Sequence, residues 1–244
     1  MKVLILGANG MLGPYFVKAL EKDHTLRLTD VNDLEDARHE YFKLDASDLD
    51  AVVDAAEGMD AIVNLSVLRH DRQIAFDVNA RGAYNAMVAA VRHDIPRVIN
   101  TGPHFTIAGP SYEDLDYRIG PDIPSASGTY LYALTKSLGQ EISRVFTENH
   151  DVHVLTLLFY HFRDTGDHSS DGQDVTPFAV TWEDAGRAFG PALTVGLDTL
   201  PSRCEAFFIF TDLPHEKFSN EKAKRVLGWQ PLDRLEYMWR KSSR

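Results

Sequence analysis

Residues 2–13, KVLILGANGMLG, join a short apolar run to a loop with three glycines. The apolar run predicts a buried strand, and the residues from Met11 onward have the spacing of an amphipathic helix. Gly7 permits a tight turn, Gly10 lets a ligand approach the backbone, and Gly13 lets the helix pack on the strand. Because the amino end of a helix attracts anions, this unit predicts a site for the pyrophosphate of a dinucleotide.

The same order of strand and then helix repeats along the chain. Further apolar runs predict strands at 25–30, 41–45, 61–66, 97–102, 152–159 and 205–212. Helical spacing predicts helices at 11–21, 48–56, 74–92, 130–149 and 219–229, the last with Ser219 as its N-cap and Gly228 as its stop. This alternation predicts an α/β fold, a Rossmann-type doubly wound parallel sheet.

The strand and helix rhythm breaks after about residue 160, which predicts two unequal parts. Residues 1–160 are expected to form the dinucleotide-binding domain. Residues 161–244 are expected to form mainly a small substrate-binding lobe, with a late strand at about 205–211 that returns to the core. The polar segment 163–174, RDTGDHSSDGQD, predicts a loop.

The composition argues against several classes of protein. The 244 residues carry 36 acidic and 25 basic side chains, a formal net charge of −11, whereas a nucleic-acid partner needs a clustered basic surface. The single cysteine, Cys204, cannot form an intramolecular disulfide or a thiolate cluster, and we expect no metal site. No run approaches the roughly 20 apolar residues of a membrane span, and the first residues lack a signal-peptide pattern. We therefore expect a cytoplasmic protein that binds neither nucleic acid nor membrane.

Asp30 ends the second expected strand, about where an acidic side chain meets the ribose in dinucleotide-binding folds. A carboxylate at this place accepts hydrogen bonds from the ribose hydroxyls and repels a 2′-phosphate. The sequence therefore favours NAD over NADP. The alternative is that Asp30 is a solvated strand end.

The stretch YLYALTK, residues 130–136, places two tyrosines and a lysine at the start of an expected helix. Tyr132 stands four residues before Lys136 and so shares its helical face, whereas Tyr130 has Leu134 at that offset. A free tyrosine has a pKa near 10, and a neighbouring ammonium stabilises its phenolate. Tyr132 is therefore the candidate acid-base residue, and Tyr130 is expected to pack or to line the rim of a pocket.

With these segments placed, the sequence resembles the extended short-chain dehydrogenase/reductase family, the NAD-dependent epimerase/dehydratase group. GANGMLG matches its glycine signature, VNARGAYN (78–85) its helix signature, and YALTK (132–136) its YxxxK motif. TWEDAGRA and KAKRVLGWQP resemble two later segments of the extended members. The resemblance implies NAD as the cofactor, contacted by Gly7, Asn9, Gly10, Met11, Leu12, Gly13, Asp30, Asp45, Ala46, Leu65, Ser66, Asn79, Tyr132 and Lys136.

Within that family, PHFTIAG (103–109), RIGPDIP (118–124) and YALTK look most like uronate dehydrogenases. Those enzymes oxidise the anomeric carbon of a hexuronic acid to a lactone. The resemblance implies a sugar or sugar-acid substrate, with Tyr132 taking the proton of the reacting hydroxyl. Two alternatives stay open: a nucleotide-sugar epimerase or dehydratase, and a catalytically weak NAD-binding sensor. The two long helices are candidates for a homodimer interface, as in many relatives.

The sequence departs from the family after the fifth expected strand, where a serine or threonine usually bonds the reacting oxygen. The matching stretch here is TGPHF (101–105). Thr101 keeps a hydroxyl and is taken as the third catalytic residue, but Gly102 occupies the usual position. A shift of register brings Thr106 into play instead.

The resemblance also implies which side chains bind the substrate. Ser66 lies at the end of the fourth expected strand, and His104 matches a substrate-contacting histidine; a solvated loop histidine is the alternative. The family usually has an arginine after the sixth strand, and Arg163 lies slightly later here as a candidate carboxylate clamp. Arg69 and His70 are further polar candidates for substrate binding, although we expect each to be a surface residue rather than a ligand.

Overall fold

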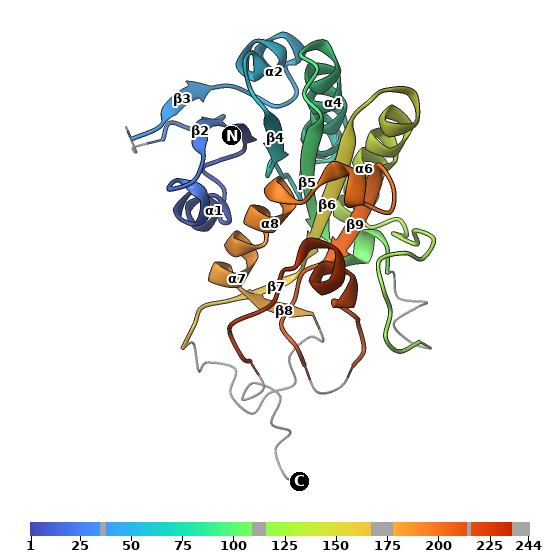
Figure 1. The fold of residues 1–244 in the computed structure, drawn as a ribbon. Helices are drawn as coiled ribbons and strands as arrows, with labels where there is room; N and C mark the ends of the chain where they lie inside the picture. The colour runs from blue at the N-terminus through green and yellow to red at the C-terminus, as the bar shows by residue number, and fades with distance from the viewer. Residues whose placement is uncertain (35–37, 109–115, 167–177, 214–215, 236–244) are drawn as a thin grey trace.

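The computed structural model describes residues 1–244 except 35–37, 109–115, 167–177, 214–215 and 236–244. Its centre is a seven-stranded sheet in the order β3-β2-β1-β4-β5-β6-β9, with every neighbouring pair parallel (Figure 1). The strands are β1 (Lys2–Leu6), β2 (Thr25–Asp30), β3 (Glu40–Lys43), β4 (Ala61–Asn64), β5 (Arg97–Pro103), β6 (His153–Phe159) and β9 (Cys204–Phe208). The strand order reverses between β1 and β4, which is where doubly wound folds bind their ligands. The predicted fold class is confirmed.

The helices and short turns connect these strands. They are α1 (Gly13–Leu20), α2 (Leu49–Ala56), α3 (Arg72–Ala75), the π-helical turn η1 (Phe76–Arg81), α4 (Gly82–Arg92), the 3-10 turn η2 (His104–Thr106), α6 (Leu131–Asn149), α7 (Trp182–Arg187), α8 (Phe189–Thr194), the 3-10 turn η3 (Leu197–Thr199) and the π-helical turn η4 (Ala223–Leu227). In the part of the chain that the structure describes, no helix is long and apolar enough to cross a membrane.

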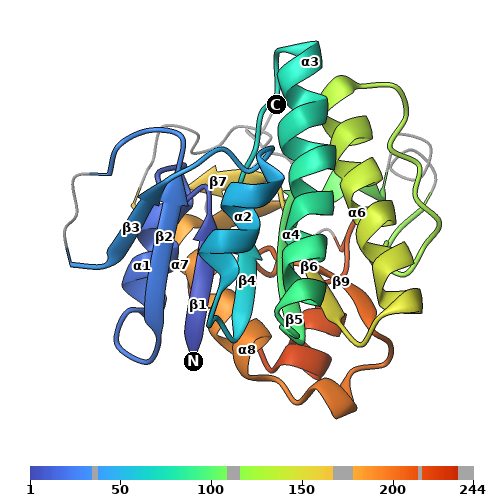
Figure 2. The same ribbon diagram turned by 90° about the horizontal axis from the view of Figure 1, so that it is seen from above.

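Both faces of the sheet are buried, because successive side chains of a strand point to opposite faces. In β1, Leu4 and Leu6 join the cluster under α2 and α4, whereas Val3 and Ile5 join the cluster under α1 and α8. Figure 2 shows α2, α4 and α6 on one side of the sheet and α1, α7 and α8 on the other. The strands therefore read as continuous apolar runs.

Helix α1 packs against segments from the last third of the chain. A Cβ on Gly186 of α7 would stand 2.7 Å from the carbonyl oxygen of Tyr15. The Tyr15 ring stacks on Trp182 with centroids 5.4 Å apart, and Phe16 meets Phe189 edge-on at 4.8 Å. The family-like segment around Gly186 thus serves to seat α1 and the glycine loop that precedes it.

Some elements differ from the sequence prediction. The helix expected at 74–92 begins earlier, because the Asp71 carboxylate caps it by accepting from the Ile74 N–H at 2.9 Å, and it contains η1. The helix after Ser219 is mostly the turn η4, which ends at Gly228 as expected, with φ of 70°. A two-stranded parallel sheet, β7 (His161–Arg163) and β8 (Ala179–Thr181), was not predicted, because each strand has only three residues.

The late strand forms at Cys204–Phe208 and pairs with β6, so residues far along the chain complete the central sheet. The division at residue 160 stays a prediction. Most of the expected loop 163–174 lies outside the described residues; its first residue, Arg163, ends β7.

Candidate active site

The glycine loop lies against the end of β4. Gly7 has φ of 82°, and a Cβ there would stand 2.8 Å from the Cα of Ser66. A Cβ on Gly13 would stand 1.9 Å from the carbonyl oxygen of Ala8, inside contact distance. Side chains are therefore excluded at both positions, and the loop presents backbone groups there at the carboxyl end of the sheet. Such a cradle fits a pyrophosphate.

Asp30 is part of the same structure. Its carboxylate is buried, at 8% exposure, and accepts hydrogen bonds from the N–H groups of Asn9 and Asn32, each at 3.0 Å. A solvated strand end is therefore excluded. The side chain ties the glycine loop to the end of β2 and places a negative charge beside it.

Asp45 and Ala46 follow β3 at the next position along this edge. The Asp45 carboxylate accepts from the Ser47 N–H at 2.8 Å. Because Asp45 is exposed, the carboxylate is also open to a ligand. Ala46 is buried, and its carbonyl oxygen accepts from Asn85 Nδ2 at 2.9 Å. Asn85 in α4 thus fixes the turn that presents Asp45.

The loop after β4 is held by Asn79, which lies in η1. Asn79 Nδ2 donates to the Leu68 carbonyl at 2.7 Å and to Thr135 Oγ1 at 2.9 Å, while its Oδ1 accepts from the Leu68 N–H at 3.2 Å. One amide therefore ties the loop that carries Leu65 and Ser66 to helix α6. This is a structural task, and the contact of Asn79 with a cofactor stays a prediction.

Lys136 reaches from α6 to this loop. Its ammonium donates to the Ser66 carbonyl at 2.8 Å, and the side chain is only 6% exposed. Burial, with a smaller contribution from the charge of Arg69, lowers the pKa of Lys136 to about 7. Ser66 therefore touches the glycine loop on one side and Lys136 on the other.

The two tyrosines of YLYALTK have different surroundings. Tyr130 is 59% exposed, whereas the Tyr132 ring lies 6.0 Å from Phe105, edge to face, and 5.3 Å from the guanidinium carbon of Arg69. Burial raises the pKa of Tyr132, and the charge and hydrogen bond of Arg69 lower it. The structure thus places Tyr132, and not Tyr130, beside a cation, Arg69.

The end of β5 carries Gly102 at the usual serine position, and the contacts around it show which neighbouring hydroxyls are available. Thr101 Oγ1 donates to the Asn64 carbonyl at 3.0 Å, so its hydroxyl proton is already hydrogen-bonded to the backbone of β4. A Cβ on Gly102 would stand 3.2 Å from Gln140 Nε2 and from Leu158, a tight fit. Thr106 is fully buried; its Oγ1 donates to the Pro103 carbonyl and accepts from Gln140 Nε2, both at 2.9 Å. The alternative register through Thr106 gains no support.

His104 lies inside an aromatic cluster. It is 3% exposed, stacks on Phe178 with centroids 4.5 Å apart, and has the rings of Tyr160 and Phe218 at 5.0 Å. The alternative of a solvated loop histidine is therefore wrong. Arg163 lies at the end of β7, partly exposed and paired in register with Thr181 of β8. A substrate role for either residue stays a prediction.

Gln140 is the site neighbour that sequence reasoning missed. It lies four residues after Lys136 and eight after Tyr132, on one face of α6, so helical spacing alone could have placed it. Its amide occupies the space beside Gly102 that a larger residue would need.

A family model described as the NAD dependent epimerase/dehydratase family matches residues 3–176. The chain belongs to this family. An L-arabinose 1-dehydrogenase (NAD(P)(+)) of Haloferax volcanii is 26% identical over 168 residues, 64% of this chain and 65% of that protein. The match therefore spans less than two thirds of that relative.

Several solved structures share the fold. A uronate dehydrogenase from Agrobacterium tumefaciens aligns with a TM-score of 0.77 at 22% identity, over 95% of this chain and 84% of that one. A glucuronic acid dehydrogenase from Chromohalobacter salexigens gives 0.78 at 22% identity, over 98% and 86%. MoeE5, solved with UDP-glucuronic acid and NAD, gives 0.78 at 16% identity, over 97% and 96%.

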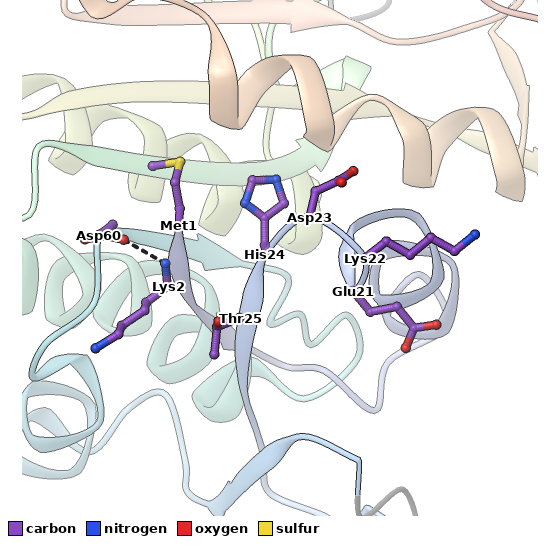
Figure 3. Close-up of a pocket in the computed structure, with 8 residues that line it drawn as sticks. All are labelled: Met1, Lys2, Glu21, Lys22, Asp23, His24, Thr25 and Asp60. Atoms are coloured by element: carbon purple, nitrogen blue, oxygen red, sulfur yellow. Dashed lines mark hydrogen bonds between the residues drawn. The ribbon is translucent and has the colours of Figure 1, made fainter.

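As in other doubly wound folds, the candidate site of this epimerase/dehydratase family member lies at the carboxyl edge of the sheet. Figure 3 shows a hollow at the opposite edge, where Met1 precedes β1 and where Lys2 and Thr25 begin β1 and β2. Its lining includes His24 and Asp60, and the Lys2 N–H donates to Asp60 Oδ2 at 2.7 Å. None of the predicted site residues lines this hollow.

Proposed function

We propose that this protein oxidises a hydroxyl-bearing carbon of a sugar or sugar acid with NAD. The observation that carries the proposal is the position of Ser66. Its backbone fills the space beside Gly7, and its carbonyl binds Lys136. The cofactor cradle and the Tyr132–Lys136 helix therefore meet at a single residue, as a hydride-transfer site requires.

The residues of the chain then have separate tasks. Gly7, Gly10 and Gly13 would hold the pyrophosphate, and Asp30 and Asp45 would meet the adenosine. When bound, NAD supplies a hydride acceptor. Tyr132 takes the hydroxyl proton as general base, and Lys136 supplies positive charge one helical turn away. Thr101 would lie beside the reacting oxygen, and it would donate to that oxygen by exchanging its hydrogen bond to the Asn64 carbonyl for one to the substrate.

A small sugar or sugar acid is the substrate class best supported. The neighbours named above as uronate and glucuronic acid dehydrogenases share the fold, and the H. volcanii relative is named as an arabinose dehydrogenase. Ser66, His104 and Arg163 are the residues we assign to the substrate. Arg163 suits a carboxylate because a guanidinium binds it through two parallel hydrogen bonds.

The test combines cofactor titration with a substrate panel. Purified protein is titrated with NAD and NADP, and NADH formation is then followed on hexuronic acids, aldopentoses, aldohexoses and UDP-sugars. We expect NAD binding and turnover on a free sugar or sugar acid, and in a Tyr132→Phe control NAD binding with turnover lower by on the order of 10²-fold or more. Epimerases and dehydratases return the hydride and form no net NADH, so the UDP-sugar products are separated by chromatography. Conversion of UDP-sugars alone, without net NADH, would replace the proposal with the epimerase or dehydratase alternative.

Gly102 favours a second candidate, a catalytically weak NAD-binding sensor. The position offers no hydroxyl, and its space is bounded by Gln140 and Leu158. Tight NAD binding without turnover on any member of the panel would support this candidate. The retained Tyr132 and Lys136 argue against it.

A further inference from the structure

Arg69 is a charged residue beside Tyr132 to which the proposed function gives no task. It lies in the loop between β4 and α3, three residues after Ser66. Its guanidinium carbon lies 5.3 Å from the centroid of the Tyr132 ring, within the range of a cation–π contact. Asn79 fixes this loop at Leu68, the residue before Arg69, through a pair of hydrogen bonds. The contact is therefore built from an anchored loop, although the arginine itself is exposed.

Lys136 alone is a weak source of charge for Tyr132 in this structure. Its ammonium donates to the Ser66 carbonyl in a buried setting, which lowers its pKa to about 7, so near neutral pH a large fraction of the amine is uncharged. A guanidinium stays protonated at any pH the protein survives. Arg69 therefore keeps its charge where Lys136 loses it.

Two aromatic neighbours also face Tyr132, and neither is a cation. Phe105 of η2 meets the ring edge to face at 6.0 Å, and Tyr130 from the same segment acts to raise the pKa of Tyr132. Burial raises that pKa further, and Arg69 opposes both effects by charge and hydrogen bonding. Arg69 is therefore the neighbouring cation that would stabilise the Tyr132 phenolate.

We propose that Arg69, whose guanidinium lies over the Tyr132 ring, is a positioning residue that stabilises the Tyr132 phenolate, so that Tyr132 can act as base. This inference rests on the proposed function and adds a residue to it. In the step, the substrate O–H bond breaks, its proton forms the O–H bond of Tyr132, and the electron pair stays on the substrate oxygen. Arg69 keeps its own protons and faces an anion before the step and a neutral phenol after it.

The first measurement needs no substrate. Nine tyrosines absorb as phenolates, so each protein is titrated with pH beside its own Tyr132→Phe partner, and the difference reports Tyr132. The titrations stay within the pH range where circular dichroism shows the fold intact. We expect Arg69→Gln to move the Tyr132 titration up by about one pH unit or more. Arg72→Gln, which removes an exposed arginine from the same segment, should leave it in place.

The opposite effect on Lys136 limits how far the Tyr132 titration moves. Arg69 also lowers the pKa of Lys136, so its removal makes Lys136 more cationic and returns part of the lost stabilisation. Arg69→Lys keeps a charge near the ring, and we expect the Tyr132 titration of this variant to lie between those of wild type and Arg69→Gln. A Tyr132 titration unchanged in Arg69→Gln would overturn the proposal.

Kinetics on the substrate found by the panel give the second measurement. The acidic limb of kcat against pH, where Tyr132 is protonated, should move to higher pH in Arg69→Gln. On that limb, kcat should fall about tenfold for each pH unit by which the limb moves. A rise in KM for sugar acids alone, with the limb in place, would instead make Arg69 a carboxylate contact and overturn the inference. If no substrate turns over, the proposed function fails, while the phenolate titration still decides the role of Arg69.

Discussion

The two halves of the candidate site are built differently. At the ends of β1, β2 and β4, backbone groups and one carboxylate make the surface, and their hydrogen bonds already exist without a ligand. Asp30 holds two N–H groups there, and Gly7 leaves no space for a side chain. At the ends of β5 and β6, aromatic rings dominate, and His104 and Phe178 stack among them.

Because of this difference, the fold allows few residue types in the cofactor half, whereas substitutions in the substrate half can change which substrate is chosen. A backbone cradle depends on φ angles and close approaches, and few residues other than glycine satisfy them. A cluster of packed rings changes its shape with each substitution. The cofactor half should therefore respond to point changes through binding, and the substrate half through the choice of substrate.

Tyr132→Phe should give the largest effect, because it removes the proton acceptor while keeping the ring. We expect turnover to fall by on the order of 10²-fold or more, with NAD affinity kept. Tyr130→Phe, two residues away and largely exposed, is the matched control and should cost little. Steady-state kinetics and NAD titration of both variants make the test. Full turnover in Tyr132→Phe would remove this tyrosine from the chemistry.

Lys136→Met tests the residue at which the two halves join. Activity and NAD affinity should both fall, since the change removes the ammonium beside Tyr132 and its bond to Ser66. The pKa of Lys136 is about 7 in the fold and near 10.5 in the unfolded chain. The unfolded chain binds more protons in this window, so the wild-type stability gains a contribution as pH rises through it. Urea unfolding without cofactor should show that slope in wild type and its loss in Lys136→Met.

Asp30→Asn sharpens the comparison on the cofactor side. The change removes the charge that repels a 2′-phosphate and keeps an oxygen for the Asn9 or Asn32 N–H. Wild type should prefer NAD over NADP by at least about tenfold, and the variant should lose most of that preference. Asp33→Asn, at an exposed carboxylate that pairs with Lys43, is the control. Equal NAD and NADP affinities in wild type would contradict the assignment.

His104→Ala probes the ring-lined half and should have the smallest effect on the chemical step. We expect KM for the substrate to rise several-fold, more than kcat falls, since the proposed role is binding. The stacked ring also packs the core, so thermal unfolding should show a loss of about 1 kcal/mol or more. His104→Phe retains the packing and serves as the control. Normal KM in both variants would make His104 a packing residue only.

The sequence predicted the cofactor half better than the substrate half. Strand ends, the glycine loop and the Tyr132–Lys136 offset follow from periodicity and spacing, which a chain displays locally. The aromatic cluster around His104 unites residues from 104 to 218, and the contact of Arg69 with Tyr132 spans a loop and a helix. Such contacts depend on tertiary packing. The π-helical turn η1 was also missed, because its residues have ordinary helical spacing.

The close packing of α1 against Gly186 of α7 affects the protein during its synthesis. A ribosome releases the glycine loop and α1 early, but the two helices that cover Tyr15 and Phe16, α7 and α8, are made some 170 residues later. Until then one face of the sheet, with Ile5 and Leu28, has only α1 as a cover and offers an apolar surface to other chains. Vectorial synthesis therefore gives the nascent protein a period of exposure that ends only when the last third emerges.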